Sequence, residues 1–149
     1  MVDEKPDQVY DWAAELIFSP DSQHVAYMAQ QSGKFFVVVD GKRALPNSEF
    51  FSISKPVFSP DSQRVAYMAR QFDKQIMVVV DGKYGPYFDD INGFIKFSPD
   101  SKRVAYMAVR NGNHFMVVDG KPGPAYDSIG TFFFSPDSKH VAYVAQQGK

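Results

Sequence analysis

The apolar and polar positions of this chain follow one short pattern that occurs four times. Each copy reads Phe-Ser-Pro-Asp-Ser, two polar residues and Val-Ala-Tyr-Met/Val-Ala, and the copies occupy residues 18–29, 58–69, 97–108 and 134–145. In the third repeat, short segments rich in Val, Phe, Tyr and Ile lie at residues 94–97, 103–109, 114–119 and 125–129. Clusters of Pro, Gly, Asp, Asn and Ser separate them, which predicts four β-strands per repeat. No segment has the roughly 10 residues at helical spacing that a helical repeat needs.

Two kinds of turn connect the predicted strands. In Ser-Pro-Asp-Ser, proline presets φ for the second position of a type I turn, and the Asp and Ser side chains can bond nearby backbone amides. The Asp-Gly pairs at residues 40–41, 81–82 and 119–120 are hairpin signals, because glycine tolerates the positive φ of a tight reversal. We therefore expect Ser-Pro-Asp-Ser to join strands one and two of each repeat, and Asp-Gly to join strands three and four.

The predicted strands at residues 25–29 and 37–39 are apolar on both of their alternating faces. Strands of this kind need cover on both faces of the sheet. Radial repetition of small sheets, each packed between copies of itself, provides that cover, and this arrangement is the β-propeller. The sequence therefore predicts an all-β protein, a β-propeller built of four-stranded antiparallel blades.

The same repeat resembles a known family. An aromatic residue, Ser-Pro-Asp-Ser, an apolar-Ala-aromatic strand and a later Val-Val-Asp-Gly are together similar to the WD-like propeller repeat of the TolB type, also found in the propellers of tricorn protease and of prolyl oligopeptidase relatives. The resemblance covers essentially the whole chain and implies the propeller fold. The Gly-His and Trp-Asp dipeptides of the true WD repeat do not occur, and Trp12 is the one tryptophan. No Gly-x-Ser-x-Gly nucleophile motif occurs either, so the resemblance carries no catalytic residue over to this chain.

The two ends of the chain match the inside of the repeat. Residues 1–11 align without a gap on residues 117–127, and residues 141–149 match the segment that precedes the third strand at Phe35. We therefore expect the N-terminus to supply the second half of a blade and the C-terminus the first half. The single propeller domain, residues 1–149, then divides into a half-blade, three repeats and a half-blade at residues 1–17, 18–57, 58–96, 97–133 and 134–149, which makes four blade equivalents.

Three arrangements satisfy these complementary halves. One chain can close into a four-bladed ring by pairing its own ends. Two chains can instead exchange half-blades head to tail and close a ring of about eight blades. The chain can also be a segment of a longer propeller. We favour a homo-oligomer, the head-to-tail dimer, because four blades is the low limit for propellers. Half-blades left open would expose the unpaired N–H and C=O groups of their edge strands.

Composition changes this picture mainly by exclusion. The 149 residues are 44% hydrophobic and 15% aromatic, which suffices for a packed core. The 16 basic and 17 acidic side chains give a formal charge of -1, whereas nucleic acid and anionic membranes usually demand a basic excess. The absence of cysteine excludes disulfides and thiolate chemistry. We therefore expect neither nucleic acid nor membrane as a partner. The composition does not indicate a cellular compartment.

Residues that recur in every copy are expected to have a structural role, because every blade requires them. The recurring aspartates are predicted to cap turns, with a four-carboxylate metal ring as the alternative; they are Asp21, Asp61, Asp100 and Asp137. The recurring tyrosines are predicted to lie in the core between blades, with a stacking ligand site as the alternative; they are Tyr27, Tyr67, Tyr106 and Tyr143. His24 and His140 fill the position of Arg64 and Arg103 in the other copies, and we interpret them as exposed polar residues at strand starts.

Function is expected where the copies differ, which is in two sets of segments. These are the loops at residues 30–34, 70–74 and 110–114 and the entries to the first strands at residues 12–15, 52–55, 91–94 and 129–131. In an up-and-down blade they share one edge, here called the varied rim, whereas the Ser-Pro-Asp-Ser and Asp-Gly turns share the opposite edge, the uniform rim. Binding residues concentrate in loops on rigid scaffolds, so the varied rim is the predicted binding site, with drift in unconstrained loops as the alternative. Its candidate residues are Trp12, Glu15, Lys55, Arg70, Phe72, Asp73, Asn92, Phe94, Arg110, Asn111, Asn113 and His114.

The sequence predicts no enzyme, no cofactor and no metal site, because it contains no His pair at i, i+4 spacing and no Gly-rich phosphate loop. The predicted function is a propeller scaffold for protein or peptide binding and for self-assembly. One alternative is a small-ligand or carbohydrate-binding propeller, in which Trp12, Phe72 and Phe94 stack on the ligand. Another is an accessory propeller segment of a larger, hydrolase-type protein.

Overall fold

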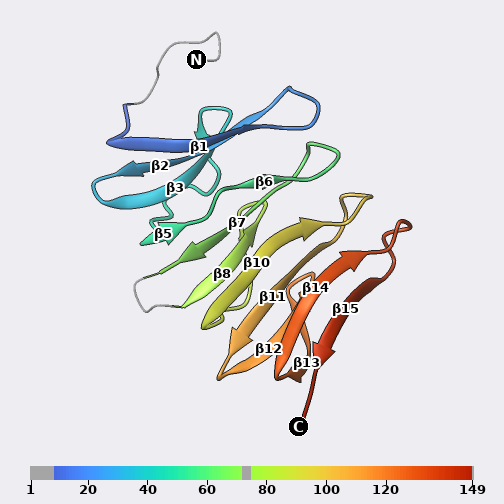
Figure 1. The fold of residues 1–149 in the computed structure, drawn as a ribbon. Coiled ribbons are helices and arrows are strands. Elements are labelled where there is room, and N and C mark those ends of the chain that lie inside the picture. The colour runs from blue at the N-terminus through green and yellow to red at the C-terminus, as the bar shows by residue number, and fades with distance from the viewer. Residues whose placement is uncertain (1–8, 72–74, 149) are drawn as a thin grey trace.

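The chain folds into a row of antiparallel sheets (Figure 1). The computed structural model describes residues 9–71 and 75–148, and these form strands and turns without any helix. Blade A consists of β1 (Trp12–Phe18), β2 (Val25–Gln31), β3 (Lys34–Val39) and β4 (Lys42–Arg43). Blade B consists of β5 (Ser52–Ile53), β6 (Val57–Phe58), β7 (Val65–Arg70), β8 (Ile76–Val80) and β9 (Lys83–Tyr84). Blade C consists of β10 (Asp90–Phe97), β11 (Val104–Arg110), β12 (Asn113–Val118) and β13 (Lys121–Tyr126), and half-blade D consists of β14 (Ser128–Phe134) and β15 (Val141–Gln146).

The prediction of an all-β fold with antiparallel four-stranded blades is confirmed for blades A and C, whose strands pair in chain order. In blade B the first strand is broken into β5 and β6, and both pieces pair with β7. Pro56 lies between the two pieces and has no N–H to give to the sheet. The other first strands are irregular at the same place, because the register shifts within residues 14–17, 92–96 and 129–132.

The repeat division starts each segment at Phe-Ser-Pro-Asp-Ser, whereas each blade starts at its first strand, so most of every first strand falls in the preceding segment. Residues 12–17, which the repeat division puts in an N-terminal half-blade, form most of β1, and Trp12 pairs with Gln30 of β2. Residues 1–8 of that predicted half-blade lie outside the described residues. Half-blade D at the other end contains a first and a second strand, β14 and β15.

Contacts between neighbouring blades form the core. In the largest cluster, Ala66 and Val78 of blade B pack with Ile95 and Tyr106 of blade C. The small alanines of the repeat let the blades approach, and Ala66 and Ala105 are both 0% exposed. Each blade therefore depends on its neighbour, because burying one Ile or Phe side chain stabilises by about 1.5–3 kcal/mol.

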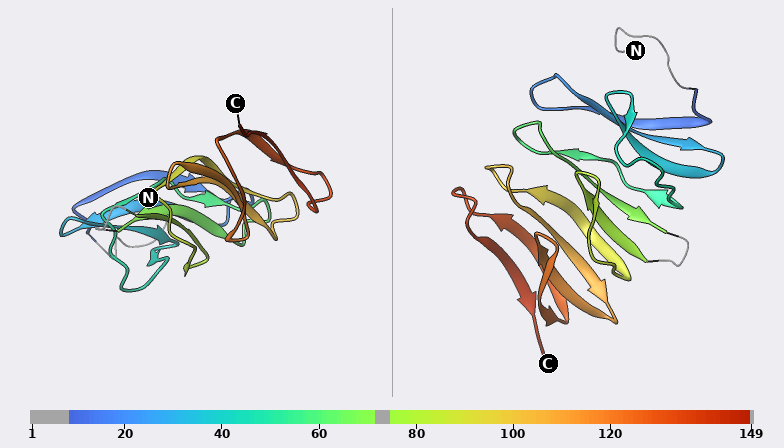
Figure 2. Two further views of the ribbon diagram at one scale, coloured as in Figure 1. Left: turned by 90° about the horizontal axis from the view of Figure 1, so that it is seen from below. Right: turned by 180° about the vertical axis from the view of Figure 1, so that it is seen from behind.

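The blades follow one another in chain order along the row, so the N-terminal blade A and half-blade D lie at opposite ends (Figures 1 and 2). Each sheet in the described part of the chain is open, and none closes on itself. The row therefore has two terminal surfaces, each with a neighbour on one side only.

The recurring Ser-Pro-Asp-Ser segments are turns, as the sequence predicts. In blade C, Ser98 Oγ donates to Asp100 Oδ1 at 2.6 Å and accepts from the Arg103 amide at 2.9 Å. The Asp100 carboxylate also accepts from the Lys102 amide at 3.1 Å. The other three copies repeat this arrangement around Asp21, Asp61 and Asp137. These hydrogen bonds confirm that the aspartates cap turns.

The same contacts lower the pKa of each turn aspartate below its ordinary value of 3.8. The largest cause is the hydroxyl that donates to the carboxylate, which is Ser98 for Asp100, and the second is the backbone amide two residues on. Asp21, Asp61 and Asp137 follow the same order of causes. A hydrogen bond to the charged form favours that form, so the folded protein holds these side chains as carboxylates.

Overpacking the joint between blades C and D tests the role of the small alanines. Ala105→Leu should lower the free energy of unfolding by about 1–3 kcal/mol, because added methylenes in a filled core force strain. Ala125→Leu is the matched control, since Ala125 is exposed in β13, and it should change stability by less than about 0.5 kcal/mol. Urea unfolding followed by circular dichroism measures both, and equal effects of the two substitutions would contradict this packing.

Acid should remove the stabilisation that the turn carboxylates supply. A carboxyl whose pKa is lowered by folding stabilises the protein above its unfolded pKa, and that stabilisation disappears as pH falls through the folded pKa. Removing the donor with Ser98→Ala should raise the pKa of Asp100 and cost more stability at about pH 7 than at about pH 2. Urea unfolding at both pH values measures this difference. In an Asp100→Asn background the pH dependence of the Ser98→Ala effect should vanish, and its persistence there would refute the assignment.

Candidate assembly interface at the ends of the blade row

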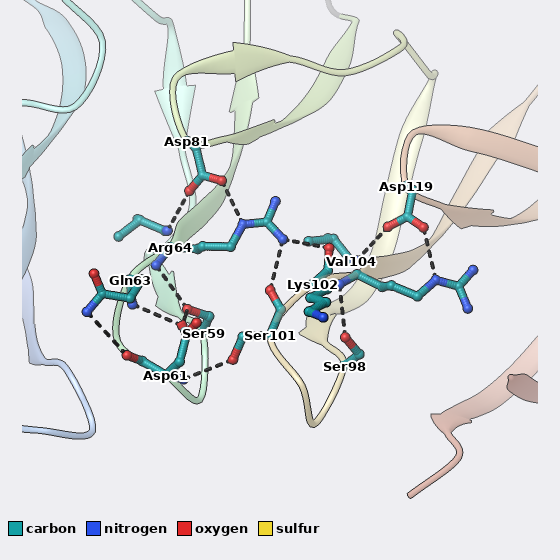
Figure 3. Close-up of polar contacts among 12 residues, drawn as sticks. Ser59, Asp61, Gln63, Arg64, Asp81, Ser98, Ser101, Lys102, Val104 and Asp119 are labelled. Carbon is teal, nitrogen blue, oxygen red and sulfur yellow. Dashed lines mark hydrogen bonds and ion pairs between the residues drawn. The ribbon is translucent and has the colours of Figure 1, made fainter. Parts of the chain in front are cut away.

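Each blade is joined to the next by a hydrogen bond between their turns. The Asp61 backbone amide of blade B donates to Ser101 Oγ of blade C at 2.9 Å (Figure 3). The same bond joins the other neighbours, from Asp21 to Ser62 at 3.0 Å and from Asp100 to Ser138 at 3.0 Å. The accepting serines are 3% exposed or less. We call this bond the turn latch, and its donor always belongs to the earlier blade.

In the joint between blades B and C, an arginine also crosses to the later blade. Arg64 Nε donates to Asp81 Oδ2 of its own blade at 2.7 Å. Its Nη1 donates to the carbonyl oxygens of Ser101 and Lys102 in blade C, at 2.9 and 2.8 Å (Figure 3). The guanidinium carbon lies 5.4 Å from the centre of the Phe97 ring. We call this set of contacts the arginine clamp.

Arg103 makes the same clamp between blade C and half-blade D. Its Nε donates to Asp119 Oδ2 at 3.0 Å, and its Nη1 donates to the carbonyl oxygens of Ser138 and Lys139 at 3.5 and 2.8 Å. The guanidinium lies 6.0 Å from the Phe134 ring. Both arginine side chains are about one-third exposed or less, so water weakens their ion pairs with aspartate. The hydrogen bonds from each Nη1 to the backbone carbonyls are the part of the clamp that joins the two blades.

The joint between blades A and B has a histidine in the arginine's place. His24 Nδ1 lies 2.7 Å from Asp40 Oδ2 of its own blade, and its ring stacks on Phe58 of blade B at 6.5 Å. Among the described residues, no carbonyl of blade B accepts a hydrogen bond from His24. An imidazole has two ring nitrogens, whereas the clamp uses the fork of a guanidinium. We call this arrangement the histidine joint.

At the N-terminal end of the row, blade A exposes the face that meets a preceding blade elsewhere in the chain. Leu16 and Phe18 are 54% and 61% exposed. Ile95 and Phe132, which hold the position of Leu16 in later blades, are 5% and 2% exposed. Ser22, at the position of the accepting latch serines, is exposed. This end therefore presents an apolar surface and the acceptor side of a turn latch.

At the other end, half-blade D exposes the face that meets a following blade elsewhere. Phe133 and Val144 are 60% and 69% exposed. Ala142 is exposed, whereas Ala66 and Ala105 at its position are 0% exposed. In addition, β15 pairs with β14 alone, so its far edge has no partner strand among the described residues. This end presents an apolar surface and an open sheet edge.

The recurring tyrosines divide according to their place in the row. Tyr67 and Tyr106 are 1% and 2% exposed, which confirms their core position, and burial raises the pKa of Tyr106 to about 12. Tyr27 and Tyr143 are half-buried, because blade A has no described blade before it and half-blade D has no described third strand. The exposure of these residues therefore depends on whether a neighbour is present.

The candidates predicted on the varied rim lie in three blades. Trp12 packs edge-on against Phe35 at 5.9 Å between ring centres in blade A. Lys55 Nζ of blade B lies 3.6 Å from Glu15 Oε2 of blade A. Glu15, Lys55 and Phe94 all lie where the first strands are irregular. Glu15 and Phe94 lie within β1 and β10, and Lys55 lies between β5 and β6.

The remaining candidates lie between blades B and C or in the turn from β11 to β12. Arg70 Nη2 lies 3.8 Å from Asp90 Oδ1, and Arg110 donates to the Tyr87 carbonyl and lies over the Phe88 ring. Asn92 belongs to β10, His114 to β12, and Asn111 and Asn113 to the turn region before and at the start of β12. Phe72 and Asp73 lie outside the described residues.

Sequence reasoning missed a repeated carboxylate on the varied rim. Asp11 Oδ2 accepts a hydrogen bond from the Ser32 amide at 2.7 Å and so holds the turn between β2 and β3. The same contact recurs from Asn111 to Asp89 and from Gly148 to Asp127, each at 2.7 Å. The available signal was an aromatic-Asp pair ahead of each of these first strands. In blade B, Phe51 stands in this place and is 59% exposed.

Two cavities lie between neighbouring blades at the uniform rim. One of about 340 Å³ lies between blades B and C beside Arg64, Lys83 and Tyr106. The other, of about 440 Å³, lies between blade C and half-blade D beside the equivalent residues Arg103, Lys121 and Tyr143. None of the described varied-rim candidates lines either cavity. Because equivalent residues line both cavities, they are two copies of one gap between blades.

The described part of the chain contains neither a cluster of metal-ligating side chains nor a membrane-spanning helix. No three His, Asp or Glu side chains gather there in a way that could hold a metal ion. No helix of the length and apolarity needed to cross a membrane occurs there.

Comparisons with known proteins identify the fold. No protein-family model matches the sequence, and no curated protein is significantly similar to it. TolB from Acinetobacter baumannii superposes with a TM-score of 0.50 at 16% identity, over 92% of this chain and 38% of TolB. The β-propeller domain of the Trilobed protease from Pyrococcus furiosus, described as having an open velcro topology, superposes with a TM-score of 0.52 at 13% identity, over 94% of this chain and 45% of that one.

The chain thus spans less than half the length of either structure. At these identities the likeness concerns the fold alone. The row of four-stranded blades is a β-propeller fold similar to that of TolB.

Proposed function

We propose that this chain is a non-enzymatic propeller scaffold that completes its blades by pairing head to tail with a second copy of itself. The observation that carries the proposal is the open edge of β15. In blade C the second strand, β11, pairs with β10 on one side and β12 on the other. In half-blade D the second strand, β15, pairs with β14 and with no other strand of residues 9–71 and 75–148.

The backbone of β15 is already extended for a further strand. The carbonyls of His140 and Gln146 accept hydrogen bonds on the β14 side. Backbone groups alternate in direction along a strand, so the amides of Tyr143 and Ala145 face the open edge. An edge of this kind binds an added peptide strand through its main chain, which is why a protein or peptide is the class of partner that we propose.

The occupant to which we commit is residues 1–11 of a second copy. Their sequence matches residues 117–127, which in blade C contain the end of β12 and all of β13. Because residues 1–11 lead directly into β1, blade A of the second copy then becomes the blade that follows half-blade D. The exposed Leu16 and Phe18 of that copy meet the exposed Val144, which covers apolar surface on both partners.

Two further observations support the proposal. Blade A and half-blade D lie at opposite ends of the row (Figure 1), which favours pairing between copies over pairing within one chain. Perturbed pKa values often mark catalytic groups, but here the shifted groups are turn aspartates and packed tyrosines such as Asp61 and Tyr67. Their shifts arise from the repeated structure of the blades, so the proposal assigns them no catalytic role.

Removing one edge amide tests the proposal. Ala145→Pro takes away an N–H that faces the open edge and leaves the hydrogen bonds between β14 and β15 in place, because proline is tolerated on the free side of an edge strand. We expect the unmodified chain to have the mass of two copies by light scattering behind a sizing column. The Ala145→Pro variant should have the mass of one copy at the same concentration.

The matched control is Ala145→Gly, which keeps the amide and adds no bulk at a position where the equivalent alanines of blades B and C, Ala69 and Ala108, are 0% exposed; it should retain the dimer. Circular dichroism should show the same strand content for all three proteins, since Ala145 is exposed. A single-copy mass for the unmodified chain at every concentration, or an Ala145→Pro variant that dimerises as well as its control, would refute the proposal.

A further inference from the structure

We infer that the contact between copies is a histidine joint, in which His140 of one copy lies over Phe18 of the next and the Asp137 amide latches onto Ser22 Oγ, without an arginine clamp. This inference rests on the proposed head-to-tail pairing and specifies its chemistry. It makes the joint between copies weaker than the clamped joints inside each copy, so that assembly is reversible.

The residues follow from the repetition of one joint along the chain. In each described joint, the residue just before the second strand lies over the phenylalanine of the next Phe-Ser-Pro-Asp-Ser segment, as His24 does over Phe58 and Arg64 over Phe97. His140 is the last residue in this series. Phe18 is the phenylalanine of the first Phe-Ser-Pro-Asp-Ser segment, and no described blade precedes it. Its side chain is 61% exposed, whereas the equivalent Phe97 in blade C is half-buried.

The turn latch extends in the same way. Every latch donates from the turn aspartate amide of one blade to the second turn serine of the next, as from Asp100 to Ser138. No described blade follows half-blade D to accept from Asp137, and no described blade precedes blade A to donate to Ser22. Ser22 has a positive φ of 61°, close to the 64° of Ser101 and the 63° of Ser138. Its backbone is therefore already in the conformation of an accepting turn.

The difference from the internal joints lies in the side chain at position 140. Arg64 and Arg103 each reach two backbone carbonyls of the following turn. His24, the internal example of a histidine joint, bonds Asp40 of its own blade and contacts the next blade by ring stacking. A joint formed by His140 therefore keeps the latch and the stacked ring but lacks the two hydrogen bonds that an arginine donates to carbonyls of the next blade.

Installing the missing clamp at the contact between copies tests the inference. His140→Arg should tighten association about tenfold, equivalent to about 1.4 kcal/mol, because a guanidinium then reaches the carbonyls of the Ser22 turn. Sedimentation velocity over a concentration series measures the dissociation constant. His24→Arg is the matched control, since it adds the same side chain inside one copy; it should raise the thermal midpoint and change the dissociation constant less than twofold.

A second variant acts from the opposite partner. Phe18→Ala should weaken association about tenfold and leave the fold intact, because the Phe18 side chain is exposed in the single chain. If the unmodified chain dimerises through β15 but neither His140→Arg nor Phe18→Ala changes the dissociation constant, the histidine joint is wrong and the proposed pairing stands. An equal effect of His24→Arg and His140→Arg on association also overturns the inference. If the unmodified chain and every variant remain single copies, the proposed pairing itself fails.

Discussion

The structure depends on one constraint, which is that each small sheet is apolar on both faces. A blade such as B can bury Ala66 and Val78 on one face and Tyr67 on the other only when it lies between two neighbours. Stability is therefore shared between blades, in the manner of repeat proteins whose units contact nearest neighbours. The terminal blades carry the same sequence pattern without a second neighbour, and their apolar side chains are exposed for that reason.

The recurring Ser-Pro-Asp-Ser turn uses one set of atoms for hydrogen bonds within its blade and another set for hydrogen bonds to the neighbouring blades. In blade B, the first serine and the carboxylate, Ser59 and Asp61, close the turn within the blade. The amide of Asp61 and the hydroxyl of the second serine, Ser62, serve the following and the preceding blade instead. This division explains why both serines and the aspartate recur together, since a turn alone requires fewer of them.

The features that the sequence predicts correctly are those with local chemistry. The turns, the strands and the core position of Tyr67 and Tyr106 follow from proline geometry and from the pattern of apolar residues. The reach of Arg64 into blade C depends on how two blades face each other, which no local pattern reveals. The contacts of the varied-rim candidates depend on the fold in the same way, since Lys55, between β5 and β6 of blade B, places its Nζ 3.6 Å from Oε2 of Glu15 in blade A.

The turn latch also gives the row a chemical polarity. Its donors all belong to the earlier blade and its acceptors to the later one, so the two ends of the row are unlike, one offering a hydroxyl and the other an amide. Two identical ends brought together would present two donors or two acceptors, and neither combination forms the bond. Any contact built on this feature is therefore heterologous, and such contacts either close into rings or continue as open fibres. For the proposed head-to-tail pairing, the angle between successive blades decides which of the two forms.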